Sequence, residues 1–292
     1  MTAAGVTAKY CYCVWLKHML LVDEITGAGV PEIIAELGPG DTIGVGVAAL
    51  LSGASRYVGI DARRFLNANA TLAIAEELVG LFRARNPFPT QGWSEIRHLL
   101  DAESFPSALL PASGNATLLS DDRANTISAD LRSALAGRPS NMIAYRAPFS
   151  DPSVVDDNSV DLLISQSVLE HVVDLRQTLA SVFRWLKPGA ITSHQFDLTS
   201  HDIVSGWDEH RRFSDPAWKL VVGRRPFMIN RMAYSTVIAT FEECGFRVVR
   251  ADRMQMAPTV PRNNLAQMWR GASDDDLSTY GGYVIAQKPY SR

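Results

Sequence analysis

Two acidic residues and a glycine turn occupy positions where an α/β protein binds a nucleoside-containing ligand. Glu36 lies near the end of an apolar run and precedes the turn Gly38-Pro39-Gly40, and Asp61 follows the next apolar run. An acid at the end of a second strand can accept hydrogen bonds from both hydroxyls of a ribose. A carboxylate at Glu36 would repel a pyrophosphate and attract the ammonium group of an amino acid. These residues therefore predict a cofactor that joins a nucleoside to a cationic amino-acid moiety.

The same turn matches the glycine pattern of dinucleotide-binding proteins only in part. In the pattern G-x-G-x-x-G, Gly38 and Gly40 fit, but Ile43 stands at the third position and the next glycine is Gly44. NAD-binding proteins also use an acid at the position of Asp61, so this residue alone does not discriminate. An NAD(P)-dependent oxidoreductase stays an alternative, although no tyrosine–lysine pair or comparable hydride-transfer site can be assembled.

A second group of polar residues follows a later apolar run and is suited to removing a proton from a hydroxyl group. We expect His201 to act as the base and Asp197 to orient it or to bind the acceptor. His194 is a candidate substrate contact, although a lone histidine within a strand is more often buried. Asp197, His201 and Asp202 could instead hold a divalent cation, because carboxylates and imidazole bind such ions, but the prediction includes no metal.

Short apolar runs alternate with helical stretches and must position these residues. An amphipathic helix over about 9–22 lies in an N-terminal segment (1–30) and either packs on the main domain (31–292) or forms a lid. Two long intervals, about 78–139 and 198–230, hold a helical insertion and a substrate-side insertion; Asp121-Asp122 could cap a helix through Leu135. Alternating strands and helices are typical of parallel βαβ units, which bind ligands at the carboxyl ends of the strands. The expected strands are 32–37, 56–60, 141–145, 160–165, 190–196, 247–254 and 282–287.

Taken in order, these motifs resemble those of the class I S-adenosylmethionine-dependent methyltransferases. Glu36 with Gly38-Pro39-Gly40, and then Asp61, match the first two family motifs; residues 147–149 and 157–172 resemble the signature "LPF…dnSfDvV…LEHv". Residues 186–190 resemble the LkPGG turn that leads into the fifth strand, and the likeness covers about 32–197. The resemblance implies an α/β fold with a seven-stranded, Rossmann-like, mostly parallel sheet, a last antiparallel pair of strands, and S-adenosyl-L-methionine as cofactor.

The resemblance also implies the residues that contact the cofactor. The family often places an acid at the end of the third strand to hold the adenine amino group, but Ile143 aligns there, so residues 144–146 must supply the contact. Residues 224–231 resemble a substrate-binding run of sugar methyltransferases, which makes Asn230 and Arg231 candidate substrate contacts; a solvated basic turn explains the run equally well. The candidate cofactor contacts are Glu36, Gly38, Pro39, Gly40, Asp61, Ala62, Ala144, Tyr145, Arg146, Ser165 and Gln166.

Composition limits the class of partner. The 292 residues carry a formal net charge of −3, with both signs scattered along the chain, which gives no reason to expect nucleic acid or an anionic membrane. The three cysteines, Cys11, Cys13 and Cys244, form neither a CxxC pair nor an even disulfide framework, so we expect a reducing, cytoplasmic compartment. No convincing signal peptide or membrane anchor is present. The composition sets no expectation for the oligomeric state.

The predicted activity is transfer of a methyl group to a hydroxyl. The fourth expected strand ends in Ser165-Gln166-Ser167-Val168 and lacks the Asn/Asp-Pro-Pro-aromatic signature of enzymes that methylate planar nitrogens. We therefore expect O-methylation of a small polar acceptor, such as a sugar or a secondary-metabolite intermediate. A non-catalytic protein that binds S-adenosylmethionine is the remaining alternative.

Overall fold

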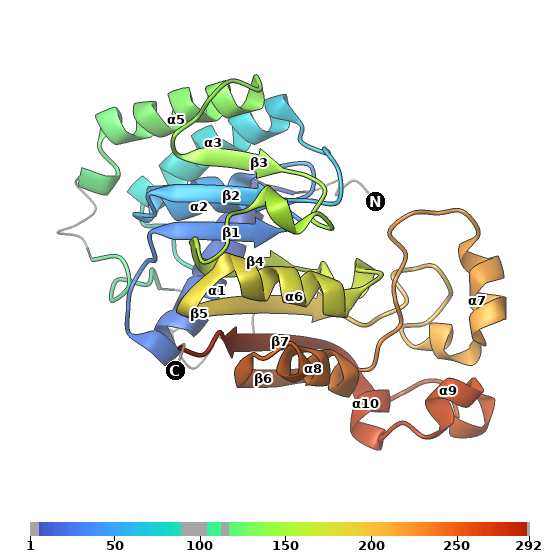
Figure 1. Cartoon of the computed structure of the whole chain (residues 1–292). Coiled ribbons are helices and arrows are strands. Elements are labelled where there is room, and N and C mark those ends of the chain that lie inside the picture. The colour runs from blue at the N-terminus through green and yellow to red at the C-terminus, as the bar shows by residue number, and fades with distance from the viewer. Residues whose placement is uncertain (1–5, 89–103, 112–116, 291–292) are drawn as a thin grey trace. The chain divides into compact units, whose positions relative to one another are not determined.

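The computed structural model describes residues 6–88, 104–111 and 117–290 (Figure 1). Part of the expected insertion at 78–139, namely 89–103 and 112–116, lies outside the described residues. The strands are β1 (Ile33–Leu37), β2 (Arg56–Ile60), β3 (Ile143–Arg146), β4 (Val160–Gln166), β5 (Leu186–Asp197), β6 (Arg247–Gln255) and β7 (Thr279–Gln287). The α-helices are α1 (Ala8–Thr26), α2 (Gly44–Leu51), α3 (Ala68–Arg83), α5 (Asp121–Leu135), α6 (Leu175–Trp185), α7 (Asp215–Val222), α8 (Tyr234–Glu243), α9 (Gln267–Arg270) and α10 (Asp274–Ser278).

The seven strands form one sheet in the order β3-β2-β1-β4-β5-β7-β6. β1 pairs in parallel with β2 and with β4, β2 pairs in parallel with β3, and β6 and β7 form an antiparallel pair. The expected fold class is confirmed. Residues 186–190 were expected to form a turn before the fifth strand, but β5 already begins at Leu186, and the Nζ of Lys187 lies 2.6 Å from Oδ1 of Asp161 in β4.

Contacts divide the chain into two compact units. Unit 1 comprises Met1–Ile164 and Arg184–Ile191, and unit 2 comprises Ser165–Phe183 and Thr192–Arg292. In unit 1, α1 packs on α2 and α3, α2 packs on β1 and β2, and α5 packs on β3 (Figure 1). The indole Nε1 of Trp15 in α1 donates to Ser52 Oγ at 2.8 Å, and the Tyr12 ring meets the Phe82 ring edge-on. These contacts support the interpretation of α1 as a packed helix.

The helix termini in unit 1 have identifiable causes. The Thr7 side chain accepts from the Tyr10 backbone N–H at the start of α1, and Gly27 ends the helix in the left-handed conformation, with φ +58°. For α5, the expected cap was one residue too late. Ser120 accepts from the Arg123 N–H, and the two aspartates after it lie in the first turn, where negative charge favours the helix dipole.

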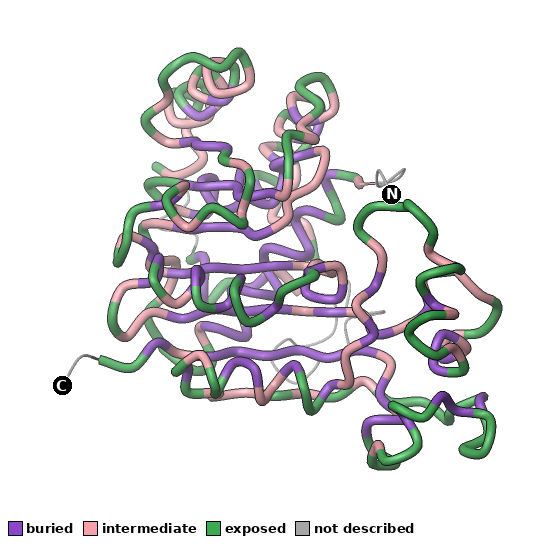
Figure 2. Tube along the Cα trace, turned by 45° about the vertical axis from the view of Figure 1, so that its right-hand side comes forward, coloured by how far each residue is buried: buried purple, intermediate pink, exposed green. Residues whose placement is uncertain are grey.

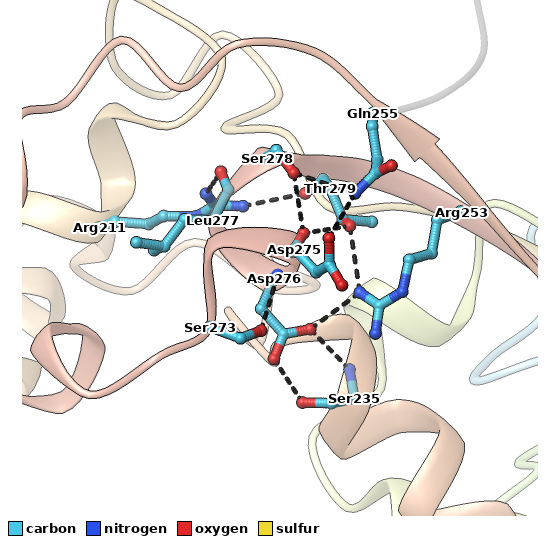
Figure 3. Close-up of polar contacts among 10 residues, drawn as sticks. All are labelled: Arg211, Ser235, Arg253, Gln255, Ser273, Asp275, Asp276, Leu277, Ser278 and Thr279. Atoms are coloured by element: carbon cyan, nitrogen blue, oxygen red, sulfur yellow. Dashed lines mark hydrogen bonds and ion pairs between the residues drawn. The ribbon is translucent and has the colours of Figure 1, made fainter.

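Unit 2 contains α8 packed on β6 and β7. Figure 2 shows β7 almost continuously buried, whereas β6 alternates between exposed and half-buried residues, as an edge strand does. Residues 198–230 are joined to β7 because the Arg211 guanidinium donates to the carbonyls of Leu277 and Thr279 (Figure 3). None of the described helices combines the length and the apolar character that a membrane span requires.

A buried carboxylate joins three elements of unit 2. Asp276 accepts from the Ser235 N–H at 3.0 Å and hydroxyl at 2.6 Å, and from Arg253 at 3.1 Å (Figure 3). Burial alone would raise the pKa of Asp276, but the hydrogen bonds from Ser235 and Arg253 outweigh it and lower the pKa. The network therefore ties α10 to the start of α8 and to β6.

Candidate active site

The glycine turn after β1 borders open space. Gly38 and Gly40 have φ values of +71° and +74°, a region that glycine enters without strain. The Gly38 N–H donates to the Ile60 carbonyl at 2.8 Å, which ties the turn to the end of β2. A Cβ built on Gly40 meets no protein atom within 4 Å. The turn can therefore be approached closely by a ligand.

Helix packing explains why Ile43, and not a glycine, stands at the third position of the dinucleotide pattern. Ile43 is fully buried at the start of α2. A Cβ on Gly44 would lie 2.5 Å from Sγ of Cys11 in α1, so this glycine allows two helices to pack closely. Neither residue is placed to contact a phosphate, which explains why the glycine pattern is one residue out of step.

Asp61 holds the glycine turn from the end of β2. Its Oδ2 accepts from the Gly40 N–H at 2.9 Å and its Oδ1 from the Ala62 N–H at 2.7 Å. Burial raises the pKa of Asp61, and the hydrogen bonds from Gly40, Ala62 and Tyr145 oppose that rise. Each carboxylate oxygen has a second lone pair, so the pair of oxygens can still accept two ribose hydroxyls.

Glu36 lies on the same face of the sheet as residues of β2. It is buried, and the Tyr57 hydroxyl donates to its Oε2 at 2.6 Å. Burial raises the pKa of Glu36 to about 8, partly offset by this hydrogen bond. Tyr57 was not predicted from the sequence as a partner of Glu36. Glu36 pairs with Gly59 of β2, and Tyr57, two residues before Gly59, lies on the same face of the sheet.

The residues expected to contact adenine end β3. Ile143 is a core residue, which is consistent with an adenine contact from other positions. The Tyr145 hydroxyl donates to the Arg63 carbonyl at 3.3 Å and accepts from the Phe65 N–H at 3.4 Å, and the Arg146 carbonyl accepts from the Asp61 N–H at 3.0 Å. The structure thus brings the expected cofactor contacts of unit 1 together around the ends of β1, β2 and β3.

Two further candidates, Ser165 and His194, lie in the interior of unit 2. Both are fully buried; the Ser165 hydroxyl is 2.7 Å from Nδ1 of His194, and Thr192 hydrogen-bonds its Nε2. Burial lowers the pKa of His194 to about 3, so the ring is neutral. His194 has the surroundings of a core histidine, and Ser165 positions its ring. Gln166, at the end of β4, is half-buried.

Beyond β5, four titratable side chains meet. Nε2 of His201 lies 3.8 Å from Oδ1 of Asp197 and 3.9 Å from Oε1 of Glu170, and its ring meets that of His171 edge-on at 4.9 Å. Burial raises the pKa of Glu170 to about 8, and the Asp197 carboxylate adds to the rise; burial lowers the pKa of His171 to about 4. Asp202 is exposed and lies outside the cluster of Glu170, His171 and His201.

Sequence reasoning did not place Glu170 and His171 in this cluster, although it singled out the LEHV motif that contains them. A signal was available, because an acid and a histidine that follow one sheet strand can meet a histidine that follows the adjacent strand. β4 and β5 are neighbours in the sheet.

Asn230 and Arg231, the expected substrate contacts, are used within the chain. Asn230 Nδ2 donates to the carbonyls of Leu169 and Val172 at 2.8 and 2.9 Å, and its N–H donates to the Glu170 carbonyl at 2.7 Å. Arg231 donates to two carbonyls of the 198–230 insertion and pairs with Asp215. Asn230 therefore fixes the turn that carries Glu170 and His171, which is a positioning role.

Part of the chain is similar to a known protein family. The family model "Methyltransferase domain" matches residues 107–193, a range that includes β3, β4 and the turn with Glu170 and His171. Among curated protein sequences, none matches the chain. Glu36, the glycine turn and Asp61 precede the matched range.

Solved structures with a similar course of the chain include several methyltransferases. An S-adenosylmethionine-dependent methyltransferase from Methanosarcina mazei is 15% identical, with 92% of this chain and 97% of that chain covered and a TM-score of 0.44. One from Mesorhizobium loti is 16% identical, with 91% and 96% covered and a TM-score of 0.44. A phosphoethanolamine N-methyltransferase from Haemonchus contortus is 13% identical, with 94% and 53% covered and a TM-score of 0.44.

Proposed function

We propose that the chain is a class I S-adenosylmethionine-dependent methyltransferase and that it methylates a hydroxyl group of a small polar molecule. The family match over residues 107–193 and the strand order of the sheet support this proposal. A sugar or a secondary-metabolite intermediate fits this class of acceptor. The observation that carries the proposal is the imidazole of His201, which lies within 4 Å of the carboxylates of Asp197 and Glu170. Such an arrangement can take up the proton that a hydroxyl loses when it is methylated.

The residues around the ends of β1 and β2 fit S-adenosylmethionine. Gly40 borders open space, Asp61 offers two oxygens to a ribose, and Glu36 is a buried carboxylate with one hydroxyl partner, suited to a cationic group. When bound, the cofactor supplies an activated methyl group. The chain's own task is then to hold the cofactor and the acceptor in line and to accept a proton.

His201 is the proposed proton acceptor, and Asp197 orients it. The His201 backbone has φ +48°, an uncommon value for a histidine that sets where its ring points. Asp197 Oδ1 accepts from the Thr199 N–H at 2.7 Å, which fixes the carboxylate beside Nε2 of His201. As a proton reaches Nε2, the Asp197 carboxylate stabilises the imidazolium.

Two further features support a small hydroxyl acceptor in the cytoplasm. Strand β4 ends in Ser165-Gln166-Ser167-Val168, without the signature for planar nitrogens. The three cysteines are free thiols, and two of them are buried, which fits a reducing compartment.

The proposal is tested with S-adenosylmethionine that carries a labelled methyl group. Wild-type protein is incubated with a panel of sugars, other polyols and phenols, and with matched amines that have the same carbon skeletons. We expect label in hydroxyl acceptors and a loss of at least ~100-fold in kcat for His201→Gln. Label in amines alone would reject the hydroxyl, and label in no acceptor would favour a protein that binds the cofactor without catalysis.

A further inference from the structure

Three side chains of unit 2 point their ligand atoms at one place. Glu170 and His171 lie in the turn after β4, and His201 lies in the loop after β5. One carboxylate oxygen and two ring nitrogens, one from each residue, all lie within 4.8 Å of one another. This is a convergence of a carboxylate and two imidazoles, the donor set that proteins use for divalent transition metals.

In the described part of the chain, these atoms have no hydrogen-bond partner. Both oxygens of Glu170, Nδ1 of His171 and Nε2 of His201 are buried without one. Glu170 is only 2% exposed. A buried carboxylate that is left without a partner costs the full desolvation penalty, so such groups are normally paired or bind a metal. The backbone at Glu170 and Asp197 lowers the pKa of Glu170 slightly, but neither carboxylate oxygen has a hydrogen bond of good geometry in the described residues.

Phe227 and Asn230 hold His171 and the turn that carries Glu170 and His171 in place. The His171 ring forms a hydrogen bond with the Phe227 backbone, and its Nδ1 has no hydrogen-bond partner in the described part of the chain. This is how metal-binding histidines are usually oriented, with the second ring nitrogen bonded to backbone or carboxylate. Asn230 donates to the carbonyls on both sides of Glu170 and His171, which fixes their turn.

The distances are close to those of a loaded site. With metal–ligand bonds of about 2.1 Å, neighbouring ligands of a tetrahedral ion lie about 3.4 Å apart. His201 Nε2 is 3.9 Å from Glu170 Oε1 and 3.8 Å from Asp197 Oδ1. The ligand atoms of Glu170, His171 and His201 lie within 4.8 Å of one another, so metal binding needs a contraction of about 0.5 Å for the His201–Glu170 pair and of up to about 1.4 Å within the whole cluster.

We infer that Glu170, His171 and His201 form a binding site for a divalent first-row transition metal ion. Two imidazole nitrogens favour ions such as Zn²⁺, Co²⁺ or Mn²⁺ over Mg²⁺ and Ca²⁺, which select oxygen ligands. The positive charge of the ion compensates the buried carboxylate. The site differs from the cluster of Asp197, His201 and Asp202 considered from the sequence, because Asp202 is replaced by Glu170 and His171.

The inference goes beyond the proposed function and does not depend on it. Nε2 of His201 cannot hold an ion and accept a proton at the same time. In the metal-loaded protein the ion would take over the activation of an acceptor oxygen as a Lewis acid, whereas His201 would do so in the metal-free protein. Metal binding itself is measured without any acceptor, so the failure of one proposal can be distinguished from the failure of the other.

The test uses the untagged full-length chain after treatment with a chelator. Zn²⁺ is titrated in competition with a chromophoric indicator, and Co²⁺ is titrated while its visible absorption is recorded. We expect one equivalent of each ion to bind, with Co²⁺ bands that report nitrogen and oxygen ligands. Glu170→Gln and His201→Gln should each weaken binding by at least ~10-fold.

Asp202→Asn serves as the matched control, since its carboxylate is exposed in the same loop, and we expect its affinity to stay within about twofold of wild type. Far-UV circular dichroism and binding of S-adenosylhomocysteine check that each variant is folded. The inference is overturned if the folded wild-type chain binds neither ion, or if Glu170→Gln and His201→Gln bind both ions as wild type does. Loss of binding in Asp202→Asn alone would also overturn it, in favour of the other cluster.

Discussion

Replacing Asp61 by alanine should weaken cofactor binding more than any change to an exposed acid of unit 1. Asp61 is 5% exposed and accepts from the backbone N–H groups of Gly40 and Ala62. Alanine removes the oxygens proposed for the ribose and at the same time releases the glycine turn. Both effects act on the same ligand, so the affinity for S-adenosylhomocysteine reports them together.

The expected loss for Asp61→Ala is about 1–3 kcal/mol, because a hydrogen bond to a charged group contributes about 1.5–3 kcal/mol and water partly replaces it in the variant. This corresponds to roughly a 5- to 150-fold increase in Kd. Asp61→Asn keeps the size of the side chain and one acceptor oxygen. We therefore expect its loss to lie between those of wild type and alanine.

Isothermal titration calorimetry with S-adenosylhomocysteine measures these affinities for wild type, both Asp61 variants and Asp156→Ala. Asp156 is an exposed acid of the same unit and should bind like wild type. A thermal unfolding curve for each variant confirms that the binding measurement refers to folded protein. If folded Asp61→Ala binds S-adenosylhomocysteine within twofold of wild type, the assignment of Asp61 to the ribose is refuted.

Three predictions concern stability. The pKa of Glu36 is raised from 4.5 to about 8, so its contribution to the free energy of unfolding is fully present below pH 4.5 and is lost as pH rises through 8. Over this range wild type should lose on the order of 5 kcal/mol of unfolding free energy relative to Glu36→Gln, as measured by urea unfolding at several pH values. A Cβ on Gly46 would collide with the Tyr57 ring, so Gly46→Ala should lower the unfolding free energy by about 1–3 kcal/mol, and an unchanged urea midpoint would contradict this. The pKa of Asp276 is lowered, so its contribution to the free energy of unfolding is present above the unfolded pKa of about 3.8 and is lost as pH falls. In the same urea assay, Asp276→Asn should lower the free energy of unfolding by about 2–4 kcal/mol at pH 7 and by less at pH 3.

The strands were predictable because their apolar runs are short and are separated by helical stretches. The errors at strand ends have local causes. Glycine normally weakens a strand, so β7 was expected to begin only at Gly282. In the structure it begins at Thr279. Here a Cβ on Gly282 would lie 2.6 Å from both the Phe196 and the Tyr234 rings, so close packing of these rings requires the glycine.

The position of a candidate site residue was predictable where that residue lies at the end of a strand. Glu36 and Asp61 could be located because each lies at or just after the end of a strand in the motif order. The contacts of Asn230 could not be predicted, because its three partners lie about sixty residues earlier and only the folded chain brings them together. The same holds for Glu170 and His171, whose surroundings depend on a loop from another strand.

Calorimetry with S-adenosylmethionine, S-adenosylhomocysteine and NAD⁺ distinguishes a methyltransferase cofactor site from a dinucleotide site. The cofactor site has a carboxylate for a cationic amino acid at Glu36 and a buried isoleucine, Ile43, where the dinucleotide pattern requires a glycine. We expect the chain to bind both adenosyl compounds and not to bind NAD⁺. Binding of NAD⁺ without binding of either adenosyl compound would contradict it.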